Sequence, residues 1–160
     1  MIRKVAPEDA PEILNIYNYY VKNTTITFET EPVSEEEMQK RIAAISQEYP
    51  YLVYEENGNI RGYCYANLWK KRCAYRHTLE STVYIDKNHF RKGIGRALMN
   101  RLIEELRNTD AHAVIACITI PNEKSVSLHE KLGFKQVSEF REVGFKFGKW
   151  LDTGDWELLV

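Results

Sequence analysis

Residues 80–106 combine acidic, basic and glycine residues in a pattern that suits chemistry on a bound anion. The segment reads as a strand, a basic and glycine-rich loop, and then an amphipathic helix. The first N–H groups of a helix have no partner within the helix, and the helix dipole adds partial positive charge there. We predict that the loop binds a pyrophosphate and that the strand before it carries the chemistry. The loop residues are Arg91, Lys92, Gly93, Ile94, Gly95 and Arg96.

The loop does not fit the two common nucleotide-binding sequences. Leu98 stands where a dinucleotide-binding fingerprint has its third glycine, and the loop follows strands that we predict to be antiparallel. No Lys-Ser or Lys-Thr pair follows the glycines, as a Walker A loop requires. Taken alone, the loop is equally consistent with a capped basic turn in solvent, so its function depends on the residues around it.

Before the loop, we predict one strand, then two helices, then three strands. Strands are expected over residues 2–5, 51–55, 60–69 and 78–85, and Asn57-Gly58 is a strong hairpin-turn signal. A first helix is expected from near Pro7 to Val21. A second helix begins at a capping box formed by Ser34 and Glu37.

After the loop, the pattern continues with two helices and three strands. Apolar residues spaced four apart mark the core face of a helix that ends near Leu106, and residues 113–119 read as a strand buried on both faces. Asn122 is expected to cap a helix that Gly133 ends. Residues 134–150 are expected to form a hairpin-like arm around Gly144 and Gly148, before a last strand over residues 156–160. We therefore predict one α+β (mixed α/β) domain over residues 1–160, with a largely antiparallel central sheet flanked by about four helices.

Composition is that of an ordinary globular protein. The chain has 160 residues, of which 44% are hydrophobic and 28% charged. A formal net charge of −1 gives no overall field that would attract nucleic acid or a membrane surface. No apolar run approaches membrane-spanning length, and the N-terminus lacks the apolar core of a signal peptide. We expect a cytoplasmic protein that binds neither nucleic acid nor membrane.

Cysteines and histidines show no metal-binding spacing. Cys64, Cys73 and Cys117 fit no zinc or redox motif, and we expect them to be reduced thiols in the core. The four histidines show no H-x-x-x-H spacing. No metal site is therefore expected.

Short motifs that extend from residue 27 to residue 156 carry a family resemblance. They are Thr27-Phe28-Glu29-Thr30-Glu31-Pro32, Tyr49-Pro50-Tyr51-Leu52-Val53, Glu80-Ser81-Thr82-Val83-Tyr84, Pro121-Asn122, Leu128-His129-Glu130 and Gly133-Phe134, continued by Gly148, Trp150, Asp152 and Trp156. In this combination the chain resembles the GNAT family of N-acetyltransferases, and within it the phosphinothricin acetyltransferase branch. The resemblance implies a GNAT-like fold and acetyl-CoA as the acetyl donor, with no metal.

The resemblance assigns three groups of residues to acetyl-CoA. The strand backbone would pair with the pantetheine arm, as an added strand would. The glycine loop would bind the pyrophosphate, and the following cap and helix would reach the cofactor from the far side. The residues outside the loop are Val83, Tyr84, Ile85, Asn122 and Ser125. Phe90 departs from the family pattern, which often has Gln or Arg there, so we expect weaker side-chain assistance but a retained site.

Glu80 is the candidate general base. Acetyl transfer needs a neutral amine, whereas an α-amine with a pKa of about 8 is mostly protonated at pH 7. A base that removes the proton typically accelerates such a reaction by about 10²–10⁴-fold. Burial on an apolar strand would raise the pKa of Glu80. Without the resemblance, a strand-end carboxylate paired with Arg72 or Arg76 is the simpler interpretation.

His129 is the second catalytic candidate, because the departing thiolate of CoA can accept a proton. Many relatives have tyrosine at this position, and the phosphinothricin branch has histidine. A histidine can act as acid or base near neutral pH, although a purely structural histidine on a helix face is the alternative. For the oxyanion, a backbone N–H near Val83 and Tyr84 is the expected donor.

The resemblance also places an anionic acceptor near five residues. Cations suit carboxylate, phosphinate and sulfoximine oxygens, and arginine binds them through two parallel hydrogen bonds. The residues are Phe28, Lys70, Arg72, Tyr75 and Thr82.

We therefore predict transfer of the acetyl group from acetyl-CoA to the α-amine of a small amino-acid analogue. Phosphinothricin, methionine sulfoximine and methionine sulfone are the leading acceptor types. The alternatives are another amine, such as a protein N-terminus, a polyamine or an aminoglycoside, and a non-catalytic CoA-binding module. Relatives are commonly dimers, so we expect a homodimer, for which the tyrosine-rich first half of the chain could supply an interface.

Overall fold

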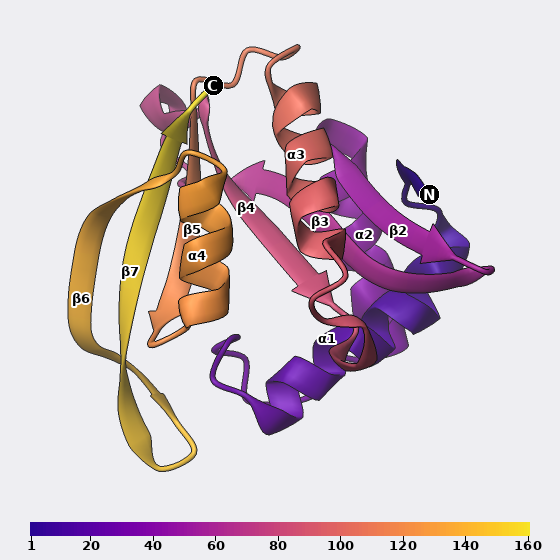
Figure 1. The fold of residues 1–160 in the computed structure, drawn as a ribbon, viewed down its shortest axis with the longest axis horizontal. Coiled ribbons are helices and arrows are strands. Elements are labelled where there is room, and N and C mark those ends of the chain that lie inside the picture. The colour runs from indigo at the N-terminus through magenta and orange to yellow at the C-terminus, as the bar shows by residue number, and fades with distance from the viewer.

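The computed structural model describes all residues, 1–160, as four α-helices around one seven-stranded sheet (Figure 1). The helices are α1 (Ala10–Asn23), α2 (Glu35–Glu48), α3 (Ile94–Leu106) and α4 (Glu123–Lys131). The strands are β1 (Ile2–Lys4), β2 (Tyr51–Glu56), β3 (Asn59–Leu68), β4 (Thr78–Ile85), β5 (Ala113–Ile120), β6 (Lys135–Lys146) and β7 (Lys149–Leu159). Three short 3₁₀ helices cover Pro7–Asp9, Cys73–Tyr75 and Lys87–His89. The predicted α+β class, with four helices and a largely antiparallel sheet, is confirmed.

The sheet is split along its middle. Its strand order is β1-β2-β3-β4-β5-β7-β6, and only the β4–β5 pair is parallel. That pair is short, because only Thr78–Glu80 of β4 align with Ala113–Ile115 of β5. Beyond it, β4 stays paired with β3 as far as Ile85, and β5 stays paired with β7 as far as Ile120. The two strands therefore diverge towards their carboxyl ends, as Figure 1 shows.

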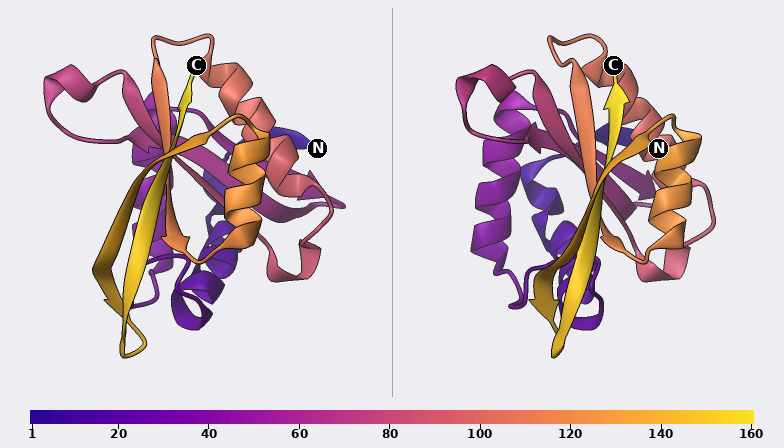
Figure 2. Two further views of the ribbon diagram at one scale, coloured as in Figure 1. Left: turned by 60° about the vertical axis from the view of Figure 1, so that its left-hand side comes forward. Right: turned by 90° about the vertical axis from the view of Figure 1, so that its left-hand side faces the viewer.

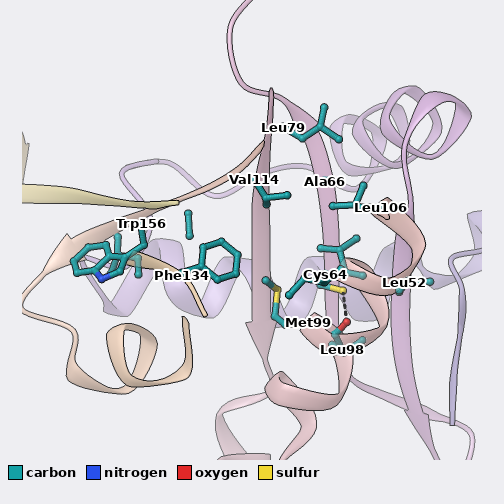
Figure 3. Close-up of a cluster of buried hydrophobic side chains, with 14 of the residues drawn as sticks. Leu52, Cys64, Ala66, Leu79, Leu98, Met99, Leu106, Val114, Phe134 and Trp156 are labelled. Carbon is teal, nitrogen blue, oxygen red and sulfur yellow. Dashed lines mark hydrogen bonds between the residues drawn. The ribbon is translucent and has the colours of Figure 1, made fainter. Parts of the chain in front are cut away.

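Helices cover both faces of the sheet. The right-hand view of Figure 2 shows α1 and α2 on one side and α3 and α4 on the other. The core on the α3 side includes Leu98, Met99 and Leu102 of the helix, packed with Phe134 and Trp156 (Figure 3). The core on the α1 and α2 side is separate and is built from aliphatic and tyrosine side chains. Each strand thus directs alternate side chains into one core or the other.

Local signals in the sequence act as predicted at several element ends. Ser34 caps α2 by accepting a hydrogen bond from the backbone N–H of Glu37 at 3.1 Å. The β2–β3 turn holds Asn57 at φ 52° and Gly58 at φ 74°, which is the left-handed conformation that an Asn-Gly turn supplies. Gly133 follows α4 with φ 96°, as expected for a helix-terminating glycine.

The predicted end of the chain is wrong in one respect. Gly144 does not lie in a turn but within β6, and the only turn of the arm is at Phe147 and Gly148. Residues 149–159 form one strand rather than a loop followed by a strand at Trp156. The reason is tertiary pairing, since β7 is held by β5 on one side and by β6 on the other.

One prediction about burial also needs correction. Only Cys64 is a core thiol, whereas Cys73 and Cys117 are exposed. The tyrosines of the first half are not all at the surface, since Tyr17, Tyr20, Tyr51 and Tyr63 are buried while the other six are half-buried, and their predicted part in an interface stays a prediction. No helix of the structure is long and apolar enough to cross a membrane.

Truncation of Leu102 should destabilise the fold without altering the site directly. The side chain is fully buried between α3 and the sheet, so Leu102→Ala removes buried methyl groups and leaves a cavity. We expect a loss of about 2–5 kcal/mol in the free energy of unfolding, measured by urea denaturation. The exposed Asn100→Ala on the same helix is the control, with an expected change within about 0.5 kcal/mol. Equal effects of the two substitutions would contradict this view of the core.

Candidate active site

The split between β4 and β5 opens into a cavity of about 260 Å³. On the α1 and α2 face, its wall includes Glu80, Thr82 and Tyr84 of β4, together with Thr27 and Phe28 from the loop after α1. On the other face, its wall includes the cap residue and two helix residues of α4, namely Asn122, Ser125 and His129. The cavity therefore passes through the sheet where the strands part. Two reactants that approach from opposite faces can meet there.

Glu80 lies at the last paired position of β4 before the split, where it is aligned with Ile115. Its side chain is partly buried, and no ion pair links it to Arg72 or Arg76. Burial, and secondarily the negative charge of Asp155, raise the pKa of its carboxyl group above the ordinary value. A carboxylate with a raised pKa is a stronger proton acceptor, which is what a general base requires.

His129 is buried, with 3% of its surface exposed, and is held by its own helix. Its Nδ1 lies 2.8 Å from the carbonyl oxygen of Ser125, which can only accept, so Nδ1 carries the proton. The other ring nitrogen, Nε2, has no partner in the protein and remains accessible from the cavity. Burial lowers the pKa of His129, and therefore the ring is neutral at pH 7 with a free lone pair on Nε2.

Several contacts fix the loop that closes the Glu80 side of the cavity. Tyr17 hydrogen-bonds the Thr27 hydroxyl at 3.0 Å and also donates to Glu29, which forms an ion pair with Arg41 at 2.6 Å. From the far arm, the buried Lys146 donates to the carbonyl oxygen of Thr27 at 2.8 Å. The loop is thus tied to α1, α2 and β6 at once.

The backbone of β4 offers a docking edge for an extended chain. Beyond Glu80, no strand pairs with the side of β4 that faces the split. The backbone N–H and C=O groups on this side of residues 81–85 have no strand partner, and the amides of a pantetheine arm have the right chemistry to pair with them. Ser81 adds a buried hydroxyl in the cavity wall that has no hydrogen-bond partner in the protein.

The glycine loop lies next to this edge. Gly93 has φ 76° and caps α3 without any side-chain hydrogen bond, so the first N–H groups of the helix stay free. Gly95 fits closely between Ile85 and Leu128, where an added Cβ would lie 3.4 Å from the Leu128 side chain. The loop cations, Arg91, Lys92 and Arg96, are exposed and form no ion pair. Free N–H groups and free cations at one helix end suit a pyrophosphate.

Although Phe90 cannot itself bind a phosphate, it contacts a cation near the loop. The ammonium of Lys124, on the first turn of α4, lies 5.0 Å from the centre of the Phe90 ring. Asn122 caps the same helix through a hydrogen bond from the Ser125 backbone N–H at 3.2 Å. Phe90 therefore brings an additional cation close to the loop, which the sequence did not indicate.

Three predicted acceptor residues lie outside the cavity wall. Lys70, Arg72 and Tyr75 belong to the connection between β3 and β4, where the Lys70 ammonium lies 4.2 Å from the Trp69 ring centre. Phe28 and Thr82, by contrast, do line the cavity beside Glu80. The structure thus brings together the residues predicted for catalysis and only two of the five predicted for the acceptor.

The cavity wall also contains residues that the sequence did not single out. Cys117 of β5 lines it. Its side chain is exposed to the cavity, but the surrounding wall desolvates the thiol, and this desolvation together with the charges of Asp155 and Glu80 raises its pKa to about 12. A continuous apolar run gives no signal of which residue faces an opening, because the split depends on how two strands separate.

Comparison with known proteins identifies the family. Residues 2–154 match the family model described as an acetyltransferase (GNAT) domain. The chain belongs to the GNAT acetyltransferase family. It is an acetyl-CoA-dependent N-acetyltransferase.

Relatives of this acetyltransferase are similar over nearly its full length. A phosphinothricin N-acetyltransferase of Streptomyces viridochromogenes is 37% identical over 98% of this chain and 85% of its own. An L-methionine sulfoximine/L-methionine sulfone acetyltransferase of Salmonella typhimurium is 37% identical over 94% of this chain and 89% of its own.

Solved structures of the family superimpose closely on the acetyltransferase. A ribosomal-protein-alanine N-acetyltransferase of Brucella melitensis is 34% identical, with a TM-score of 0.98 over 100% of this chain and 99% of its own. A phosphinothricin acetyltransferase of Sinorhizobium meliloti, solved in complex with acetyl-CoA, is also 34% identical, with a TM-score of 0.96 over 100% of this chain and 88% of its own.

Removal of a loop cation should weaken binding of acetyl-CoA. Arg96 is exposed at the start of α3 and has no acidic partner, so its charge is available to a phosphate. We expect Arg96→Ala to raise the dissociation constant for acetyl-CoA about 3- to 30-fold, and the difference to shrink in high salt. Calorimetric titration measures it, with the exposed Arg107→Ala beyond the other end of α3 as control. Equal weakening by both substitutions would point to net charge rather than to the loop.

Proposed function

We propose that the protein transfers the acetyl group of acetyl-CoA to the α-amine of a small amino-acid analogue, with Glu80 as general base. The observation that carries this proposal is the partly buried carboxylate at the apex of a cavity through the sheet. Acceptors of the phosphinothricin, methionine sulfoximine and methionine sulfone type are favoured by the names of relatives about 37% identical. In this proposal, residues 1–160 form one catalytic domain, and the protein acts in the cytoplasm.

In this proposal the two faces of the sheet have different tasks. Acetyl-CoA supplies an acyl group on a good leaving group, and it would lie along Val83, Tyr84 and Ile85 with its pyrophosphate on the glycine loop. The acceptor would approach from the α1 and α2 face, between Phe28 and Thr82. The amine would then meet the thioester in the split.

Glu80 would remove the proton that the ammonium form of the acceptor carries. The neutral amine then attacks the thioester carbon directly, so no protein nucleophile is needed. Cys117 is a poor nucleophile in any case, because its raised pKa keeps it a thiol at neutral pH. Backbone N–H groups near Val83 and Tyr84 would stabilise the negative charge that develops on the carbonyl oxygen.

His129 would serve the leaving group. Since its Nδ1–H is bound to Ser125, the neutral ring has only a lone pair to present at Nε2. It would therefore take up a proton released during the reaction and return that proton to the CoA thiolate. A low pKa favours the return step, because the protonated ring is then a stronger acid.

The anionic groups of the acceptor would need cationic partners, but no lysine or arginine of the single chain lines the cavity. Lys70, Arg72 and Tyr75 remain the proposed partners, although in a single chain they lie on the β3–β4 connection, outside the cavity wall. A different amine is the second candidate, and the name of the Brucella melitensis protein, which refers to an alanine of a ribosomal protein, favours it.

Steady-state kinetics with a panel of amines tests the proposal. We expect acetylation of methionine sulfoximine or phosphinothricin, and Glu80→Gln should lower kcat/KM by about 10²–10⁴-fold near pH 7. The variant should be at least as stable to heat as the parent, because burial of the Glu80 carboxylate opposes its ionised form. Acetylation of peptide N-termini but no amino-acid analogue would contradict the acceptor assignment. Unchanged turnover by Glu80→Gln at every pH would contradict the base assignment.

We further propose that the protein is a homodimer that pairs through the arm formed by β6 and β7. β6 is an edge strand of the sheet, and an unpaired apolar edge tends to be covered by another chain. Apart from Leu159 at the far end of β7, the arm carries six apolar side chains that are 51% to 62% exposed. They are Val137, Phe140, Val143, Phe145, Phe147 and Trp150.

A charge on the arm should break this dimer. Trp150 is 62% exposed near the tip, so Trp150→Lys should shift the molar mass measured by light scattering from that of two chains towards one. Leu159→Lys is a matched control, because Leu159 is 61% exposed at the opposite end of the same strand. A monomeric parent protein, or a variant that stays fully dimeric, would contradict the proposed interface.

A further inference from the structure

Asp155 of β7 lies on the same face of the sheet as Glu80. Glu80 is aligned with Ile115 of β5, and Cys117, two residues further along β5, is aligned with Asp155. Because side chains alternate along strands, Glu80, Cys117 and Asp155 all point to the α1 and α2 side. Cys117 lies opposite Asp155 in the β5–β7 pair, two residues along β5 from the position aligned with Glu80, and it lines the cavity.

The Asp155 carboxylate is held in place by the arm. The hydroxyl of Ser138 on β6 donates to it at 2.8 Å and accepts from the Asp155 backbone N–H at 3.0 Å. This reciprocal pair occurs where the register of β6 against β7 shifts. No ion pair neutralises the Asp155 charge, so its field acts on the neighbouring groups of that face.

Both groups that face Asp155 respond to its charge. The pKa of Glu80 is raised first by burial and then by Asp155. The pKa of Cys117 is raised to about 12 first by burial, then by Asp155 and then by Glu80. The raised pKa values of two groups on two strands therefore have one neighbour, Asp155, as a shared cause.

We propose that Asp155 is a positioning residue of the acetyl transfer, whose fixed negative charge makes Glu80 a better proton acceptor than burial alone would make it. This rests on the proposed role of Glu80 as base. Asp155 would not touch either substrate, and it would act through the electrostatic field across β5.

Several other titratable groups lie near Glu80, but their charges do not shift its pKa. Tyr65 of β3 interacts with Thr82. Burial first, and then the charge of Glu80, raise the pKa of Tyr65, so it remains a neutral phenol. Glu157 of β7 is aligned with Ile115, on the same face as Asp155. Glu29 is engaged by Arg41 and Tyr17 in the loop over the cavity, and the Lys146 ammonium donates to Thr27. Among these groups only Asp155 shifts the pKa of Glu80 by its charge.

The pH dependence of kcat/KM tests the proposal. A base must be deprotonated to act, so the rate falls as the pH drops through the pKa of Glu80. Asp155→Asn removes the repelling charge but keeps an oxygen that Ser138 can bond, so the acid limb should move to lower pH. We expect the ratio of kcat/KM at pH 6 to kcat/KM at pH 8 to rise about two- to threefold. Glu157→Gln, on the same strand and face, should leave the ratio unchanged.

A second readout does not depend on turnover. Removal of the Asp155 charge should also lower the pKa of Cys117, so alkylation of this thiol by iodoacetamide at pH 9 should become about two- to threefold faster. Mass spectrometry of the peptide that contains Cys117 separates it from the exposed Cys73. Asp155→Ser replaces Asp155→Asn if the latter does not fold.

The outcomes separate the two proposals. A shifted acid limb with faster alkylation supports the role of Asp155, and an unchanged acid limb in a folded variant overturns it. Failure of the base assignment has another signature, because Glu80→Gln would then turn over like the parent while Cys117 alkylation still responded to Asp155→Asn.

Discussion

The separation of β4 from β5 is the feature on which the rest of the site depends. A parallel pair that continued beyond Glu80 would satisfy the backbone of both strands and would close the sheet. Because the strands part, β4 keeps one unpaired edge, and a cavity opens between the two faces. The remaining elements act around this opening. α3 brings free N–H groups to one end, α4 covers one face, and the loop after α1 covers the other.

The same opening makes ionisation of Glu80 unfavourable in the folded protein. Glu80 is partly desolvated and faces a second carboxylate, so ionisation of Glu80 opposes folding. Since its pKa is raised in the folded state, its contribution favours the fold at low pH and is lost as the pH rises through the folded pKa. Two well-packed cores and the ion pairs of the loop after α1 offset this cost. Strain of this kind at a carboxylate is expected where the carboxylate must accept a proton.

Much of the fold follows from local signals in the sequence. The Asn57-Gly58 turn, the Ser34 cap and the four-residue spacing of apolar residues in α3 each determine a structure within a few residues. The arm was predicted less well, because the run of β7 through Gly154 depends on strands on both sides. Local preference cannot reveal that support.

The residues of the candidate site also differ in how well the sequence alone predicts them. Glu80, Asn122 and His129 could be placed from motifs, and the structure brings them to one cavity. Cys117 and Asp155 could not be placed from motifs. Which strand residues face the opening depends on the register of three strands, and a local motif does not contain that information. The β3–β4 connection shows a different limit, because a motif gives the types of Lys70 and Arg72 but not their distance from the cavity wall, outside which they lie in a single chain.

A crystal structure of the protein with acetyl-CoA and a bound amine acceptor shows whether donor and acceptor meet from opposite faces of the sheet within the split. We expect the pantetheine amides to hydrogen-bond the free edge of β4, with the thioester between Glu80 and His129. The acceptor amine should lie within hydrogen-bond reach of the Glu80 carboxylate. A cofactor bound away from the split, or an amine that enters from the α4 side, would overturn this arrangement.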